Sequence, residues 1–146
     1  MKPPKVEAII AAELPRIKNL ECDGTTRVLH YALNKAGIPH KIYTGDVTFN
    51  GKVVPLHFWI KLPDGRIIDY KLRMWIGNSA PEGIFEPKGI EYNGVEVDLP
   101  VNEMLYQILT STFAEGGQIN GLTVYEAVYL YAKRALKQPY LSLIHI

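Results

Sequence analysis

At 146 residues, the chain is long enough for one domain with a hydrophobic core and short for two. Its side chains are 47% apolar and 21% charged, and its formal net charge at pH 7 is +1. Because Lys and Arg are scattered and apolar runs are short, the composition excludes a strongly basic nucleic-acid binder and a bilayer span. The single cysteine, Cys22, cannot form a disulfide within this chain, which fits a reducing, cytoplasmic location.

Two helices are predicted in the first quarter of the chain. The first covers residues 5–19, where Pro15 bends or ends it because proline has no backbone N–H to donate. The second begins at about residue 24 or 25 and ends at residue 36, since apolar side chains recur there at three- and four-residue spacings. Asp23 is the expected N-cap of this helix, and Gly37 is the expected stop.

From about residue 40 the pattern changes to that of β-strands. Three stretches are rich in β-branched and aromatic residues: KIYTGDVTF (41–49), KVVPLHFWIKL (52–62) and RIIDYKLRMW (66–75). The connectors Asn50-Gly51 and Pro63-Asp64-Gly65 are typical of tight turns, because each contains a residue that tolerates positive φ. The sequence therefore predicts a three-stranded antiparallel meander.

The rest of the chain predicts a loop, a further hairpin and two more helices. Residues 76–89 are rich in Pro and Gly and are expected to form the loop. The stretch GIEYNGVEVDL (89–99) predicts a hairpin that turns at Asn93-Gly94, and helices are expected at residues 101–114 and 122–137. Helices on both sides of an antiparallel meander make this an α+β domain.

The last six residues, LSLIHI (141–146), read like an in-frame translation of a common sequencing adapter. On this interpretation the single domain comprises residues 1–140, and His145 is no site candidate. The alternative is a short natural tail that packs on the core.

Cys22 stands where the second helix is expected to begin, and this position changes the chemistry of a thiol. The unpaired N–H groups and the positive end of the helix dipole favour thiolate over thiol. The same N–H groups can donate hydrogen bonds to an oxyanion. The alternative is that Cys22 is a small buried core residue, as free cysteines often are.

The next two strands of the meander supply a base and an acid. His57 lies among bulky apolar residues and shares a strand face with Trp59 and Lys61. Asp69 also lies among apolar residues, where a carboxylate is costly to bury without a partner. Pairing about the Pro63–Gly65 turn puts Asp69 within about one residue of direct opposition to His57. A carboxylate so placed fixes the tautomer of an imidazole and stabilises its cation.

These stretches together resemble the transglutaminase-like branch of the papain-like cysteine-enzyme superfamily, including its short bacterial peptidases. The matching residues are Cys22 at the head of a helix, Gly37-Ile38-Pro39 after it, the strand YTGDV, His57-Phe58-Trp59, and DGRIID ending at Asp69. The resemblance covers about residues 20–75. It implies a papain-like core in which the helix that carries Cys22 packs on the antiparallel meander. It further implies Cys22 as nucleophile, His57 as general base and acid, Asp69 as the orienting carboxylate, and a thioester intermediate formed from an amide.

Residues that flank these three are weaker candidates for the oxyanion hole and for the lining of a substrate cleft: Asn19, Asp23, Trp59, Arg73 and Trp75. Asn19 is the candidate side-chain donor to an oxyanion. Asp23 and Gly24 depart from the aromatic or small residue that is often found beside the family's nucleophile. The Asp23 carboxylate would oppose a thiolate if it pointed inward.

The favoured function is thiol-dependent acyl transfer on the amide bonds of a peptide or protein substrate. Hydrolysis by a cysteine peptidase or amidase is preferred because the chain is small. A cross-linking or deamidating transferase and a catalytically inactive binding module on the same fold stay open as alternatives. A metal site of Cys22, His57 and Asp69 is less favoured, because no two of them are closely spaced ligands. No cofactor, metal, nucleic-acid partner or membrane partner is expected, and nothing in the sequence indicates an oligomeric state.

Overall fold

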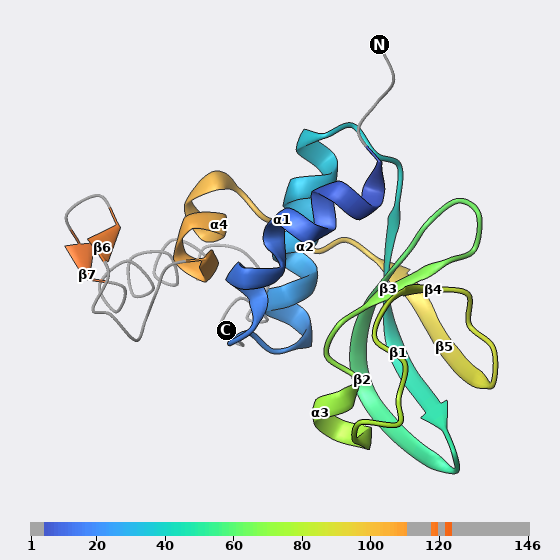
Figure 1. Ribbon diagram of the computed structural model, residues 1–146. Coiled ribbons are helices and arrows are strands. Elements are labelled where there is room, and N and C mark those ends of the chain that lie inside the picture. The colour runs from blue at the N-terminus through green and yellow to red at the C-terminus, as the bar shows by residue number, and fades with distance from the viewer. Residues whose placement is uncertain (1–4, 111–117, 120–121, 124–146) are drawn as a thin grey trace.

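The computed structural model describes residues 5–110, 118–119 and 122–123, which combine a helical part with a five-stranded antiparallel sheet (Figure 1). The strand order in the sheet is β4-β3-β2-β1-β5. In chain order the elements are α1 Val6–Ile17, α2 Cys22–Lys35, β1 Lys41–Phe49, β2 Lys52–Lys61, β3 Ile67–Asp69, α3 Arg73–Ile76, β4 Gly83–Phe85, β5 Ile90–Val97, α4 Glu103–Thr110, β6 Gln118–Ile119 and β7 Leu122–Thr123. The predicted α+β class is confirmed.

Helix α1 confirms the first predicted helix, but Pro15 lies inside it and does not end it. Proline removes one backbone donor, and the helix continues to Ile17 because one of its faces is held against the core. The side chains of Ile10 and Ile17, two turns apart on that face, are only 1% and 2% exposed.

Helix α2 begins at Cys22, earlier than the sequence predicts, and its N-cap is Glu21 rather than Asp23. Asp23 instead lies in the first turn, where a carboxylate is favoured by the helix dipole. The other end is as expected. Gly37 has a φ of +73°, and its N–H and that of the next residue bond back into the last turn, which is the Schellman arrangement.

The first hairpin of the predicted meander is confirmed, and the third strand is shorter than predicted. Strands β1 and β2 pair about Asn50-Gly51, both of which have positive φ. Strand β3 ends at Asp69, and residues 73–76 form helix α3 instead of continuing the strand. The cause is local: Oδ1 of Asp69 accepts the N–H of Lys71 at 3.1 Å, so a side chain replaces the ladder bond and turns the chain.

Two further predictions about the sheet are wrong. The region expected to be a loop, residues 76–89, contains β4, which pairs with β3. The stretch expected to turn at Asn93-Gly94 is one continuous strand, β5, paired along β1. A Cβ on Gly94 would collide with the carbonyl oxygen of Thr44 and lie 2.7 Å from the Trp59 ring. Glycine is therefore required here by a close approach of strands and not by a turn.

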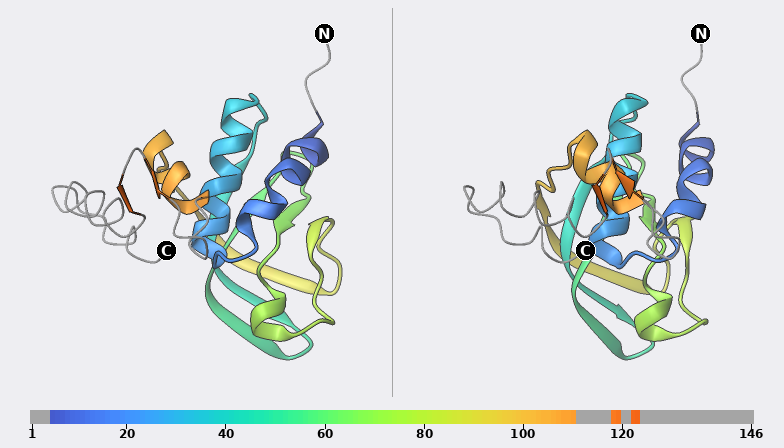
Figure 2. Two further views of the ribbon diagram at one scale, coloured as in Figure 1. Left: turned by 60° about the vertical axis from the view of Figure 1, so that its left-hand side comes forward. Right: turned by 90° about the vertical axis from the view of Figure 1, so that its left-hand side faces the viewer.

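The sheet is coiled, so that its two edge strands approach each other. Phe85 of β4 and Tyr92 of β5 have ring centroids 6.4 Å apart. One sheet face packs against α1 and α2, which lie side by side (Figures 1 and 2). The other face encloses a second apolar cluster, formed by Val47, Val54, Trp59, Ile67, Leu72, Ile76, Ala80 and Ile90. The expected packing of the cysteine-bearing helix on the sheet is confirmed.

The C-terminal predictions are tested only in part. Helix α4 starts at Glu103, after Asn102 caps it through a 2.8 Å bond from the N–H of Leu105, and it is described as far as Thr110. The predicted helix at 122–137 is wrong at its first two residues, which form β7 paired with β6. Residues 124–137 and the tail 141–146 lie outside the described residues. Of the helices described, none has the length and apolar character needed to cross a bilayer.

Candidate active site

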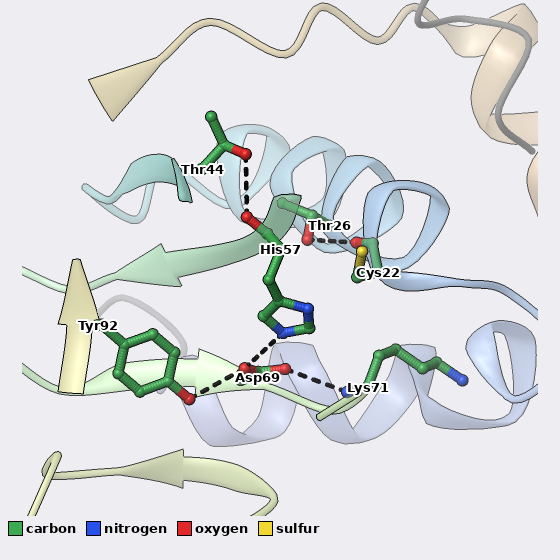
Figure 3. Close-up of polar contacts among 7 residues, drawn as sticks. All are labelled: Cys22, Thr26, Thr44, His57, Asp69, Lys71 and Tyr92. Carbon is green, nitrogen blue, oxygen red and sulfur yellow. Dashed lines mark hydrogen bonds and ion pairs between the residues drawn. The ribbon is translucent and has the colours of Figure 1, made fainter. Parts of the chain in front are cut away.

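Three residues far apart in the sequence meet where α2 begins beside the sheet (Figure 3). Cys22 is the first residue of α2, His57 lies in β2, and Asp69 is the last residue of β3. The structure thus brings together the three residues to which the sequence assigned nucleophile, base and orienting acid.

His57 and Asp69 form a buried pair. The Nε2 atom of His57 donates to Oδ2 of Asp69 at 2.8 Å, and the residues are 1% and 4% exposed. Because Nε2 is engaged, the remaining ring nitrogen, Nδ1, is the one turned toward the side on which Cys22 lies (Figure 3). The carboxylate therefore selects which nitrogen is available for proton transfer.

A β-bulge just before His57 aims its side chain. Gly45 pairs with His57 but Val47 pairs with Val54, so two residues of β2 face one residue of β1. Val54 and His57 are three residues apart, and strict alternation would put them on opposite faces. The extra residue places both on the inner face of the coiled sheet. Leu56, inside the bulge, has a φ of +56° and is 82% exposed.

Asp69 is a diagonal neighbour of His57 rather than the nearly direct one that the sequence predicts. The pairing of Ile60 with Ile68, continued by one residue, puts Asp69 level with Trp59, two residues along the strand from His57. Diagonal neighbours on one sheet face are within reach of long side chains, and the imidazole spans the gap.

Tyr92 is a fourth member of the site that sequence reasoning missed. Its hydroxyl donates to Oδ2 of Asp69 at 3.0 Å, the oxygen that also binds His57. Burial raises the pKa of Tyr92, and the carboxylate of Asp69 raises it further, so the hydroxyl keeps its proton. No sequence signal distinguishes Tyr92 from the other tyrosines, because its position depends on the coiling that carries β5 toward β3.

The environment of His57 favours its cation. Burial lowers the pKa of His57, but the hydrogen bond and charge of Asp69 and the interaction with Cys22 outweigh burial and raise it to about 9. The sulfur and Nδ1 are not within hydrogen-bonding geometry of each other in the described part of the chain. Such contacts are commonly long in unliganded sites and tighten when a substrate binds.

The start of α2 offers donors beside the sulfur. Cys22 is half-buried, and no side chain caps the helix at Glu21. Its own backbone N–H is in the first turn of a 14-residue helix, at the positive end of the helix dipole. The arrangement therefore combines a nucleophilic atom with a donor suited to an oxyanion.

A narrow crevice, with a free volume of only about 10 Å³, opens between the helix start and the sheet. Its walls include Cys22 and Thr25 from α2, and Phe58, Tyr70 and Lys71 from the sheet side. The Thr25 hydroxyl is buried, and among the described residues it has no hydrogen-bond partner. The crevice therefore has both polar and apolar walls, with the Thr25 hydroxyl on one side and Lys71 on the other.

The weaker sequence candidates lie in varied places. Asn19 is exposed in the turn between α1 and α2, and Asp23 is buried in the first turn of α2, 6% exposed. Trp59 is 2% exposed and packs between Tyr43, His57 and Tyr92. Its ring stacks against that of His57, and it is not among the residues that line the crevice beside Cys22.

The two candidates after Asp69 are on α3. Arg73 donates from Nε to the carbonyl of Ala80 at 2.8 Å and pairs with Glu82 at 3.5 Å, which ties α3 to the segment before β4. Trp75 is 58% exposed on the same helix. Neither residue lines the crevice beside Cys22.

Within the described residues, no three His, Cys, Asp or Glu side chains are grouped so as to hold a metal ion.

Comparisons of the chain with protein-family models, with curated proteins and with solved structures found no match.

Proposed function

We propose that this chain is a transglutaminase-like cysteine enzyme with a papain-like core, which hydrolyses amide bonds of a peptide or protein through Cys22, His57 and Asp69. The observation that carries the proposal is the buried His57–Asp69 pair, whose free ring nitrogen is on the side of a cysteine at an uncapped helix start. Structural cysteines do not need an imidazole held in one tautomer, whereas a thiol nucleophile does.

In the proposed reaction, the His57 ring holds the proton and the sulfur of Cys22 carries the negative charge. The sulfur attacks the amide carbon, and the S–C bond forms as the carbonyl oxygen takes up the charge near the N–H groups of α2. Nδ1 of His57 gives its proton to the leaving nitrogen as the C–N bond breaks. A thioester on Cys22 and a free amine result.

Water then resolves the thioester. It attacks the same carbon while Nδ1 of His57 takes its proton, and the S–C bond breaks to return the charge to the sulfur. The product is a carboxylic acid. The raised pKa of His57, about 9, supports its role as the acid of the first half-reaction at neutral pH. The bond to Asp69 keeps the ring in one orientation through both halves.

The test is turnover of a peptide library by the wild-type chain beside Cys22→Ala, with and without added methylamine. The proposal predicts new carboxyl termini or deamidated side chains with the wild type and none with the variant. Methylamides formed in place of acids would identify a transferase. No product under either condition would contradict the proposal and favour a binding module on the same fold.

A further inference from the structure

A second pair of titratable side chains lies outside the proposed active site, where α2 leads into the sheet. His30 is on α2, two turns after Cys22, and His40 directly precedes β1. Nδ1 of His30 and Nε2 of His40 are 2.6 Å apart, with ring centroids 4.9 Å apart and planes inclined at 70°. This contact joins the helix that carries Cys22 to the strand paired with that of His57.

The neighbouring groups fix where the protons are in the neutral pair. The carbonyl of Ile38 only accepts, so Nδ1 of His40, at 2.7 Å from it, carries a proton and Nε2 of His40 is bare. His30 must therefore donate from Nδ1 to His40. Its own Nε2 is then bare and accepts the amide N–H of Asn34 at 3.3 Å. All three hydrogen bonds are consistent with this single placement of the ring protons.

The same chain of bonds accommodates one extra proton but not two. A proton added to Nε2 of His30 requires only that the exposed amide of Asn34 turn and present its oxygen. A second proton must go to Nε2 of His40, which then faces the N–H of His30 at 2.6 Å. Two N–H groups cannot face each other at that separation, so the contact breaks.

Positive and negative side chains from the surrounding elements both lie near this histidine pair, and their effects partly offset each other. The pair lines a crevice with residues of β1 and of the β5 end. The charged groups that face it are Arg27 of α2, Lys41 of β1, Glu96 of β5 and Asp98 after β5. Lys41 and Glu96 are paired at 3.5 Å. Burial, His40 and Arg27 lower the pKa of His30, and Asp98 only partly offsets them.

We infer that His30 and His40 form a proton-operated clasp between α2 and the sheet, closed when the pair carries at most one extra proton and opened by acid. The unfolded chain accepts both protons near pH 6.5, the ordinary value of histidine. The folded chain resists the second proton, so the clasp contributes stability that is complete above about pH 6.5 and is lost as the pH falls. Opening loosens the contact between α2, which carries Cys22, and the sheet, which carries His57. The clasp itself does not depend on the proposed function; only its effect on catalysis does.

The first test is the tautomeric state, read by long-range ¹H–¹⁵N correlation spectra at about pH 7.5, one pH unit above the ordinary pKa of histidine. The clasp requires the proton on Nδ1 in both His30 and His40. A ring of His40 protonated on Nε2 overturns the inference.

The second test is acid sensitivity. Between about pH 7 and pH 5, the unfolding constant in urea should rise about tenfold more in the wild type than in His30→Gln or His40→Gln, because one unit of pKa is tenfold. Lys35→Gln, on the same helix and away from the pair, should behave like the wild type. Equal acid sensitivity of the wild type and both histidine variants overturns the clasp. These readouts need no turnover, so an inactive protein would contradict the proposed function and not the clasp.

Discussion

Tyr92 and His57 donate hydrogen bonds to the same oxygen, Oδ2 of Asp69, at 3.0 and 2.8 Å. The other oxygen of that carboxylate accepts the N–H of Lys71. Three donors from two strands and the turn after β3 therefore hold one buried carboxylate in a single orientation. These three hydrogen bonds fix the Asp69 carboxylate, so the imidazole that it binds has little freedom to rotate.

We predict that Tyr92→Phe destabilises the protein and makes His57 more basic. The ring still packs against Trp59, but the carboxylate loses a donor, and hydrogen bonds to charged groups contribute about 1.5–3 kcal/mol. With fewer donors, Asp69 attracts the ring proton more strongly, so the pKa of His57 rises. Urea unfolding and NMR titration of His57 measure both effects. Tyr43→Phe is the control, because the Tyr43 ring also stacks against Trp59. An unchanged His57 titration would refute the coupling.

We also predict that stability falls as the pH rises through the alkaline range. The folded chain holds the His57 proton to about pH 9, whereas unfolded histidine releases it near 6.5. The folded state thus binds more protons than the unfolded state in this window. The resulting contribution to the free energy of unfolding is complete below about pH 6.5 and is lost as the pH rises toward 9. His57→Gln removes the effect. Thermal unfolding against pH should give converging curves for the two proteins, and parallel curves would contradict the raised pKa.

Leu56→Asn should stabilise the protein by about 0.5–1 kcal/mol, because Leu56 has a φ of +56° and asparagine tolerates this conformation better. Little packing is lost, since the side chain is 82% exposed. Leu56→Ile should destabilise, since β-branched residues tolerate positive φ poorly. The control Val53→Asn, exposed on the same strand with no positive φ, should not stabilise. Urea unfolding that ranks Leu56→Ile above Leu56→Asn would contradict strain at the bulge.

Gly94→Ala should destabilise the protein by about 2–3 kcal/mol, since an added Cβ meets Thr44 and the Trp59 ring that supports His57. Gly89→Ala is the matched control. Its added Cβ meets no atom within 4 Å, and only the positive φ of +71° opposes it. The cost there should be about 1 kcal/mol. Similar losses in the two variants would show that close approach is not what requires Gly94.

The parts of the fold that sequence reasoning predicted are those with local causes. Gly37 ends α2 and Asn50-Gly51 turns the first hairpin, because both need positive φ within a few residues. His57 and Asp69 were placed together for the same reason, as they are on successive strands joined by a short turn. A carboxylate among apolar residues indicates a partner nearby, and the histidine was the available one.

The parts that sequence reasoning missed depend on contacts between distant segments. Asn93-Gly94 has the composition of a turn, but it forms part of a strand because β1 pairs closely beside it. Tyr92 reaches Asp69 only because the sheet coils, which no local pattern reports. Asp69 also ends its own strand by bonding to the N–H of Lys71, so one side chain both forms the site and shortens β3.

The central claim is that His57, held by Asp69, activates the sulfur of Cys22, and alkylation of the folded protein by iodoacetamide at neutral pH measures this directly. Mass spectrometry follows modification of Cys22, the single cysteine in the chain. The account predicts that His57→Gln slows alkylation at least about tenfold, while Lys35→Gln leaves the rate unchanged. Equal rates in the wild type and His57→Gln, with both proteins folded, would contradict it.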